Sequence, residues 1–306
     1  MNKKCLCIIV NWNGWSDTSN AIKSLALQEK VKLDLVIVDN GSTDSSKHAI
    51  AEFRKTSKSA DFGSIDKFYF IDSDANLGFA GGVNLALRQY VDSGYDYFWL
   101  LNSDATPKPD CLFNLISEAS SNRYGFCSSI VINALTPELL ESVGAGKHYP
   151  FTGKSRLIGA GDPISKLQGT NIVLPTKNTY LSGASLLIDV EVLRSTGYLK
   201  EDYFMYAEEK DWQFRAKADG WNIGIASNSM ITHKKSASFS KDRSKYYYYI
   251  SRANILFERD HFGFGASIAA SIALLLHSAV TSKTLKERLA ILIGIKDGLL
   301  RNSGAR

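Results

Sequence analysis

The chain has 306 residues, 44% of them hydrophobic and 22% charged, which is typical of a globular protein with one large α/β domain or a domain plus an appendage. Its four cysteines lack the CxxC spacing of metal sites, so reduced cytoplasmic thiols are expected. The first apolar run is too short to be the core of a signal peptide. The net charge of +5 is uneven: residues 232–306 carry 13 Lys/Arg and 5 Asp/Glu (+8), and residues 1–231 carry 23 and 26 (−3). An acidic body with a basic tail predicts metal or phosphate chemistry in the body and an anionic surface as a partner of the tail.

Strands and helices alternate through the first 130 residues. The predicted strands are residues 5–12, 33–39, 68–71, 95–101 and 126–132. The predicted helices are residues 17–28, with Ser16 as N-cap, followed by 43–55, 79–91 and 110–120. This alternation predicts a mainly parallel sheet with helices on both faces.

The periodicity weakens after this point. Residues 133–180 are rich in Gly, Pro, Ser and Thr and predict short strands and loops over the active face. Strand character returns at residues 183–188 and 222–226, with a helix between them at 207–218.

The tail has a different character. Residues 264–281 are almost uncharged and close to the shortest helix that spans a bilayer. One face of that helix carries Ser267, Ser271, Ser278 and Ser282, with His277 beside them. The next segment is basic (Lys283, Lys286, Arg288, Lys296, Arg301, Arg306) and has an apolar stripe (Leu285, Leu289, Leu292, Leu299). A helix pair on an anionic membrane surface fits both features, and the alternative is a helical hairpin packed on the body or on a second subunit.

An aromatic-rich apolar run at residues 97–101 ends in Asn102-Ser103-Asp104. The run predicts a buried strand that delivers a carboxylate to the sheet edge, because Pro107 and Pro109 stop it from continuing. The carboxyl ends of the strands form the ligand crevice of open α/β sheets, where an acidic motif can hold a divalent cation against a nucleotide diphosphate. A simple turn is the alternative.

Two further segments point to the same crevice. Asp39 follows an apolar strand and could accept hydrogen bonds from a nucleobase or a ribose, or could merely cap its turn. The glycines of residues 76–84 allow close approach of a phosphate or sugar to the backbone, but they lack the GxGxxG spacing of NAD-binding proteins.

An acid-rich helix start and a histidine complete the pattern. Glu208, Glu209 and Asp211 crowd the first turn of the predicted helix, where an ionised carboxylate near a bound hydroxyl is a general base. Only one of Glu208 and Glu209 is expected to face the substrate, and Asp211 could instead pair with Arg215 at i+4. His233 can join a carboxylate on a metal ion, although a structural role is the alternative.

The order of these motifs resembles glycosyltransferase family 2, most closely its rhamnosyltransferase-like branch, over residues 5–240. The resemblance is carried by residues 10–14, 38–45, 76–81, 100–104 and 204–211, and by His233 with Ser236 and Ser238. It implies a GT-A fold for residues 1–240. The composition of the tail predicts that residues 241–306 form a C-terminal helical extension at the membrane surface.

The resemblance also implies roles for individual residues. Glu209 resembles the catalytic base, although the family usually has Asp there, and Glu208 is the second candidate. Asp104 and His233 resemble the ligands of Mn²⁺ or Mg²⁺. The residues expected to bind the nucleotide sugar are Asn11, Asp39, Asn76, Gly78, Gly81, Asn102 and Gly183.

The function that follows is inverting, metal-dependent transfer of a sugar, rhamnose from dTDP-rhamnose, to a lipid-linked glycan of bacterial cell-surface polysaccharide such as O-antigen. The alternatives are a UDP-hexose-using transferase, a nucleotidyltransferase and a non-catalytic nucleotide- or glycan-binding subunit. The expected location is cytoplasmic, peripheral on the inner face of the cytoplasmic membrane. A homodimer through the C-terminal helices is an open alternative, and no nucleic acid partner is expected.

Overall fold

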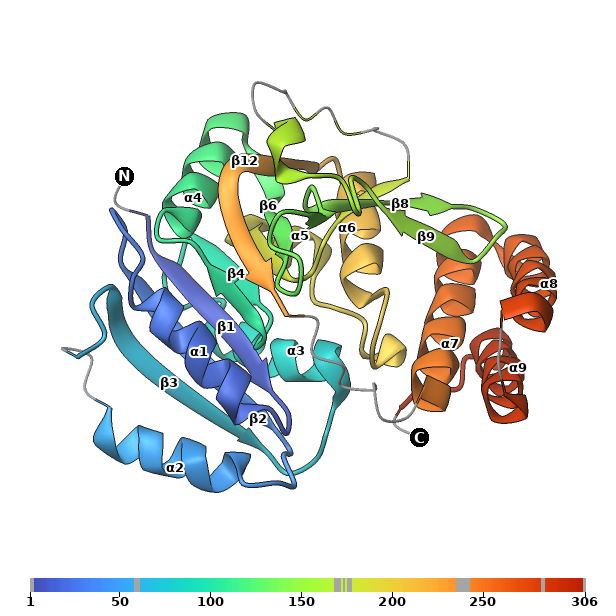
Figure 1. Cartoon of the computed structure of the whole chain (residues 1–306), viewed down its shortest axis with the longest axis horizontal. Coiled ribbons are helices and arrows are strands. Elements are labelled where there is room, and N and C mark those ends of the chain that lie inside the picture. The colour runs from blue at the N-terminus through green and yellow to red at the C-terminus, as the bar shows by residue number, and fades with distance from the viewer. Residues whose placement is uncertain are drawn as a thin grey trace.

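The computed structural model describes residues 3–57, 61–167, 172, 174, 178–234, 243–281 and 284–304. The strands of its main sheet are β1 (Cys5–Asn11), β2 (Leu33–Asn40), β3 (Ile65–Ser73), β4 (Tyr97–Leu101), β5 (Ala105–Pro107), β6 (Tyr124–Asn133), β7 (Leu140–Ser142), β11 (Ser185–Asp189) and β12 (Asn222–His233). A smaller antiparallel sheet contains β8 (Ala145–Tyr149), β9 (Lys154–Leu157) and β10 (Thr179–Leu181). The helices are α1 (Trp15–Leu25), α2 (Ser46–Thr56), α3 (Gly78–Tyr90), α4 (Cys111–Asn122), α5 (Val190–Thr196), α6 (Glu208–Ala218), α7 (Arg243–Phe262), α8 (Phe264–Thr281) and α9 (Leu285–Leu300) (Figure 1).

The main sheet follows the order β3-β2-β1-β4-β11-β6-β12-β5, with β7 paired to β6. β3, β2, β1 and β4 are parallel, as the alternation of strands and helices predicts. The second half is mixed, because β11 and β5 each run antiparallel to their neighbours and neither is preceded by a crossover helix.

Helices cover both faces of this sheet, and alternate residues of each strand supply the two cores. In β1, Cys7 and Ile9 pack on the face covered by α1 and α4, whereas Leu6 and Ile8 pack on the face covered by α3 and α6. The predicted α/β class, a sheet with helices on both faces, is confirmed.

Two helix starts differ from the prediction because distant side chains decide them. α1 begins at Trp15 with Gly14 as its N-cap, so Ser16 lies inside the helix. α2 begins at Ser46, since the side chain of Asn13 accepts hydrogen bonds from the backbone N–H groups of Thr43 and Asp44 and holds these residues in a turn.

The C-terminal region contains one helix more than the prediction. α7, which includes the tyrosine run 246–249, lies between the body and the pair α8 and α9 (Figure 1). α8 has the predicted bounds, and no helix of the described residues has the length and apolarity needed to cross a membrane. Ser282, Lys283, Ser236, Ser238 and Arg306 lie outside the described residues.

Candidate active site

A cavity of about 720 Å³ opens at the carboxyl ends of the strands. Its wall comes from the ends of β1, β2, β4 and β12, from the start of α3 and α6, and from α7. Among the predicted site residues, those that line it are Asn76, Gly78, Asn102, Asp104, Gly183, Glu208, Glu209 and His233. Asn11, Asp39 and Gly81 lie outside its lining. Segments far apart in sequence therefore meet at one crevice.

Asp104 and His233 are in direct contact in this cavity. His233 Nε2 lies 3.1 Å from Asp104 Oδ1, and His233 Nδ1 lies 2.9 Å from Glu141 Oε2. The contact arises because β5 pairs with β12, which places Ala105 opposite His233. Burial by itself would lower the pKa of His233, but hydrogen bonds and the charges of Asp104 and Glu141 raise it to about 9.

These residues suit a divalent cation. A carboxylate oxygen and a neutral imidazole nitrogen are both ligands of Mn²⁺, so Asp104 and His233 would hold such an ion once the ring gives up its Nε2 proton. Glu141 binds the other ring nitrogen of His233, as partners behind a metal-bound histidine do. No cluster of three or more His, Cys, Asp or Glu side chains suited to a metal occurs within the described ranges.

Glu141 is a residue that the sequence analysis missed. It lies in β7, inside the segment 133–180 that the sequence predicts only as short strands and loops. β7 reaches the cavity by pairing with β6, and its sequence alone carries no signal of that contact.

The start of α6 places Glu208 and Glu209 in the cavity wall, although only one of them was expected to face it. The Oε2 atom of each is buried and has no hydrogen-bond partner among the described residues. Burial raises the pKa of both carboxyl groups. The charge of Glu209 raises the pKa of Glu208 further, well above its usual range, whereas backbone hydrogen bonds and Lys210 oppose the increase at Glu209.

The loop before α6 is strained and is held from two sides. Phe204, Tyr206 and Ala207 have φ values of 60°, 68° and 64°, a left-handed region that costs such residues energy and often marks functional sites. The carbonyl of Phe204 accepts a hydrogen bond of 2.8 Å from Phe79, and its ring stacks on Tyr249 with centroids 5.0 Å apart. α3 and α7 therefore fix the approach to the two glutamates.

The glycines of the site make room for other parts of the chain. A Cβ atom on Gly78, which has a φ of +74°, would lie 2.1 Å from the carbonyl oxygen of Phe204. On Gly81 it would lie 2.6 Å from Leu77 Cβ, and on Gly183 it would lie 3.2 Å from Glu209 Cγ. Gly78 and Gly183 thus allow the segment that carries the glutamates to pack closely.

Replacing Gly78 by Ala is expected to lower the thermal midpoint and to displace residue 204. The positive φ alone costs about 1 kcal/mol, and the clash with the Phe204 carbonyl adds about 1–3 kcal/mol. The matched control is Gly94→Ala, since Gly94 has a φ of +79° and no atom within 4 Å of its Cβ position. Equal midpoints for the two variants in a thermal melt would contradict the role of the Phe204 contact.

Asn11 and Asp39 form a buried network beneath the crevice. Asp39 Oδ1 accepts hydrogen bonds from Asn11 Nδ2 at 3.1 Å and from Ser42 Oγ at 2.5 Å. The next residues along the chain, Trp12 and Asn40, line the cavity in their place. Binding of the nucleotide by Asn11 and Asp39 stays a prediction.

Asn40 orders the loop that contains Asn76. Its side chain donates to the Asn76 side chain at 3.2 Å and to the Gly78 carbonyl at 2.8 Å, and it accepts from the Leu77 N–H at 3.0 Å. Asn40 belongs to a segment that carries the family resemblance, but the sequence analysis assigned it no role.

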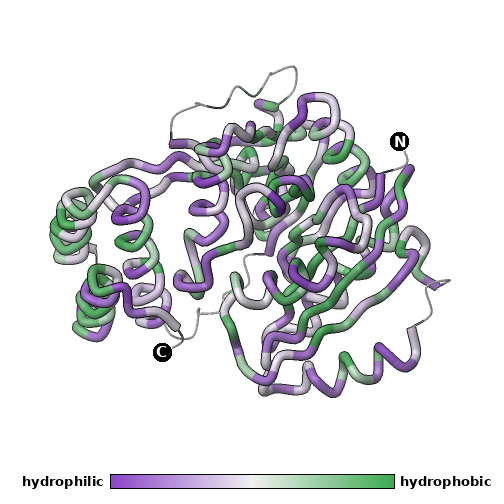
Figure 2. The backbone as a smooth tube through the Cα atoms, turned by 180° about the vertical axis from the view of Figure 1, so that it is seen from behind, coloured by the Kyte–Doolittle hydropathy of each residue, from purple (hydrophilic) through white to green (hydrophobic). Residues whose placement is uncertain are grey.

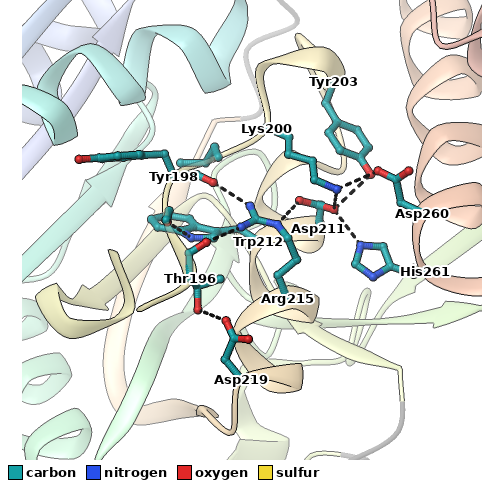
Figure 3. A network of polar contacts seen from close by, with 12 residues as sticks. Thr196, Tyr198, Lys200, Tyr203, Asp211, Trp212, Arg215, Asp219, Asp260 and His261 are labelled. Atoms are coloured by element: carbon teal, nitrogen blue, oxygen red, sulfur yellow. Dashed lines mark hydrogen bonds and ion pairs between the residues drawn. The ribbon is translucent and has the colours of Figure 1, made fainter. Parts of the chain in front are cut away.

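Asp211 lies behind the cavity in a network of ion pairs (Figure 3). Its carboxylate pairs with Arg215 at 2.8 Å, Lys200 at 3.2 Å and His261 at 2.8 Å. The alternative of an Asp211–Arg215 pair is confirmed. Because His261 belongs to α7, the network also connects α6 to the C-terminal region.

A GT-A-type sheet with paired glutamates and an Asp–His contact in one crevice has the architecture of a sugar transferase. Residues 6–160 match the profile described as "Glycosyl transferase family 2". This chain belongs to glycosyl transferase family 2.

Its relatives include the low-salt glycan biosynthesis hexosyltransferase Agl10 of Haloferax volcanii, 26% identical over 81% of this chain and 72% of the relative. An N-acetylglucosaminyl-diphospho-decaprenol L-rhamnosyltransferase of Mycobacterium tuberculosis is 22% identical over 87% of this chain and 90% of the relative. Among solved structures, the mannosyltransferase PcManGT of Pyrobaculum calidifontis, in complex with GDP-Man and Mn²⁺, aligns with a TM-score of 0.59. The identity is 12%, over 98% of this chain and 88% of that one. This structural likeness supports the fold.

Proposed function

We propose that the protein is an inverting glycosyltransferase that moves a sugar from a nucleoside diphosphate donor to a lipid-linked glycan acceptor of bacterial cell-surface polysaccharide. The observation that carries the proposal is the meeting of Glu208 and Glu209 with Asp104 and His233 around one cavity. The sugar proposed is rhamnose from dTDP-rhamnose, which the name of the mycobacterial relative supports, and a UDP-hexose is the competing donor.

Glu209 is the proposed base. Two adjacent buried carboxylates do not both ionise easily, and the pKa of Glu208 stands well above its usual range, so Glu208 keeps its proton. Glu209, with Lys210 beside it, is then available to take the proton of the acceptor hydroxyl. That oxygen attacks the anomeric carbon from the face opposite the diphosphate.

Asp104 and His233 would hold the Mn²⁺ or Mg²⁺ ion, which offsets charge on the leaving diphosphate when it is bound. Glu141 orients His233 for this task, and Asn102 Nδ2 lies 3.4 Å from His233 Nε2. Asn76 and Asn102 line the cavity, and we propose that their side-chain amides donate hydrogen bonds to the donor sugar while Asn11 and Asp39 support the nucleotide side.

A screen of nucleotide sugars with purified protein tests the proposal. dTDP-rhamnose and UDP-hexoses are incubated with Mn²⁺ and a lipid-diphosphate glycan, and free nucleoside diphosphate and glycosylated lipid are measured. Mn²⁺-dependent release of nucleoside diphosphate with product is expected. In a parallel incubation with a nucleoside triphosphate and a sugar 1-phosphate, release of pyrophosphate would show a nucleotidyltransferase. Binding without turnover of any donor would show a non-catalytic subunit.

We further propose that residues 1–240 form the catalytic domain and residues 241–306 an extension that rests peripherally on the cytoplasmic face of the membrane. α8 exposes Phe264, Ile268, Ile272 and Leu276 in one stripe, and its serines Ser267, Ser271 and Ser278 face inward. α9 adds exposed Leu285, Leu289 and Leu292. Green, hydrophobic stretches recur along the backbone of the C-terminal helices in Figure 2. Exposed Lys286, Arg288 and Lys296 give the face the charge that anionic lipids attract.

The double variant Ile272→Glu/Leu289→Glu is expected to bind phosphatidylglycerol vesicles at least about tenfold more weakly in a flotation assay. Each side chain contributes about 1.5–3 kcal/mol when fully buried in an apolar phase. Leu135→Glu is the control, because Leu135 is 82% exposed elsewhere on the body. Equal vesicle binding by the double variant and the unmodified protein would refute the membrane proposal. If light scattering shows a dimer that the double variant loses and Leu135→Glu keeps, this face instead binds a second copy of the chain.

A further inference from the structure

A buried polar cluster lies behind the catalytic glutamates. It joins Lys210 of α6, His148 of β8, Ser155 of β9 and Glu258 of α7. Lys210 Nζ lies 3.3 Å from Ser155 Oγ and 3.5 Å from His148 Nδ1, and His148 Nε2 lies 3.1 Å from Glu258 Oε1. His148 and Glu258 are fully buried, and Lys210 is 3% exposed. Ser155, by contrast, is exposed. The cluster thus connects α6 to the C-terminal region through three buried side chains.

Lys210 is a buried cation without a direct ion pair. Among the described residues no carboxylate oxygen lies within 4.0 Å of its Nζ, which sits 3.9 Å above the centre of the Phe257 ring. Burial lowers the pKa of Lys210 to about 8, and the charges of Glu209, Glu258, Glu208 and Asp211 oppose the decrease. A buried ammonium needs such anions nearby, and Glu209 exerts the largest of these charge effects.

Hydrogen bonds fix how His148 faces Lys210. The Glu258 carboxylate, which can only accept, binds the N–H groups of Phe151 at 3.2 Å and Gly153 at 3.1 Å and also His148 Nε2. Burial lowers the pKa of His148 and favours its neutral ring. With its proton on Nε2, the ring turns the Nδ1 lone pair toward the Ser155 hydroxyl and the Lys210 ammonium. The chain Glu258–His148–Lys210 is therefore oriented to keep Lys210 in its charged form.

We propose that Lys210 is a positioning residue for catalysis, whose buried charge holds Glu209 in the ionised form that a base requires, and that α7 supports this charge through Glu258 and His148. The inference rests on the proposed function. It makes the C-terminal region part of the catalytic machinery as well as a surface for binding.

Other charged and titratable groups face the same place. Glu208 adjoins Glu209 on α6, and Tyr180 of β10 packs near both Glu209 and Lys210. Asp104, His233, Glu141 and Arg243 share the cavity with Glu209. The carboxylates in this group disfavour a negative charge on Glu209. Lys210, the cation next to Glu209 on α6, offsets their effect.

The test is a pH titration of the Glu209 carboxyl by ¹³C NMR in the full chain, with Glu209→Gln identifying the signal. In Lys210→Met the midpoint is expected to rise by at least about one pH unit, because a nearby opposite charge lowers a carboxyl pKa by about 1–3 units. Lys210→Arg, which keeps the charge, should restore it. Lys217→Met is the matched control: Lys217 lies two turns later on α6, its Nζ donates to the Thr179 carbonyl, and burial lowers its pKa to about 8 as well.

An unchanged Glu209 midpoint in Lys210→Met would overturn the proposal. If that variant does not fold, Lys210→Gln, which can still bind Ser155, takes its place. The acid limb of the kcat/KM profile should move by the same amount as the NMR midpoint. Because the titration needs no substrate, a shifted midpoint in a protein that transfers no sugar would refute the proposed function and leave the Lys210–Glu209 coupling intact.

Discussion

Replacing Glu209 by Gln is expected to lower the rate of sugar transfer about 10²- to 10⁴-fold, the usual contribution of a positioned general base. The amide keeps the size of the side chain and its packing against Gly183 but cannot take a proton at neutral pH. Binding of the donor should change little. Steady-state kinetics with a glycan acceptor, together with calorimetric donor binding, separate the two effects.

Glu208→Gln is the matched control for this change. Glu208 lines the same cavity on the same helix, but burial and the charge of Glu209 raise its pKa well above the usual range. In the proposed mechanism it is the protonated member of the pair, which an amide resembles. We expect this variant to keep most of the activity. The reverse result, an active Glu209→Gln and an inactive Glu208→Gln, would exchange the two roles.

The second large effect is expected at Asp104. Asp104→Asn should abolish Mn²⁺-dependent activity and weaken the binding of Mn²⁺. Glu141→Gln should weaken Mn²⁺ binding less, by about 10- to 100-fold, because it removes only the hydrogen-bond partner that supports His233. Chelation of the metal from the unmodified protein should reproduce the loss of activity. Mn²⁺ titration followed by electron paramagnetic resonance measures the affinities directly.

Asp110→Asn provides the comparison for Asp104. Asp110 lies six residues later, outside the cavity lining, and its side chain makes no capping hydrogen bond to α4. Activity and Mn²⁺ affinity should stay unchanged in this variant. If Asp104→Asn behaves in the same way, Asp104 is not a metal ligand and the centre of the proposed site lies elsewhere.

Some features could be predicted because neighbouring residues carry them. The five-residue apolar run before Asn102 forms a fully buried strand, β4, and the turn after it delivers Asp104 to the cavity. The bounds of α8 match the prediction, since its apolar composition and its end near a basic segment are both visible in the chain. Helix and strand periods are local properties, so a single sequence is enough to detect them.

Other features depend on contacts that no local pattern encodes. α7 was missed because its start combines Arg243 with a tyrosine run, and its buried positions are set by packing against α6 and α9. Successive side chains at the ends of β1 and β2 point in opposite directions. Asn11 and Asp39 therefore form a buried network, whereas the next residues, Trp12 and Asn40, line the cavity. The serine stripe of α8 was visible, but its inward direction was not.

The sequence by itself determined the family, the α/β alternation and the carboxylates at the strand and helix ends, because these depend on residue type and short-range spacing. Only the tertiary structure decided which of these groups meet. His233 contacts Glu141, which is 92 residues away in the sequence, and His148 contacts Glu258, which is 110 residues away. Such pairs form because strand pairing and helix packing bring distant segments together. Their effects on charge and pKa therefore exist only in the folded protein.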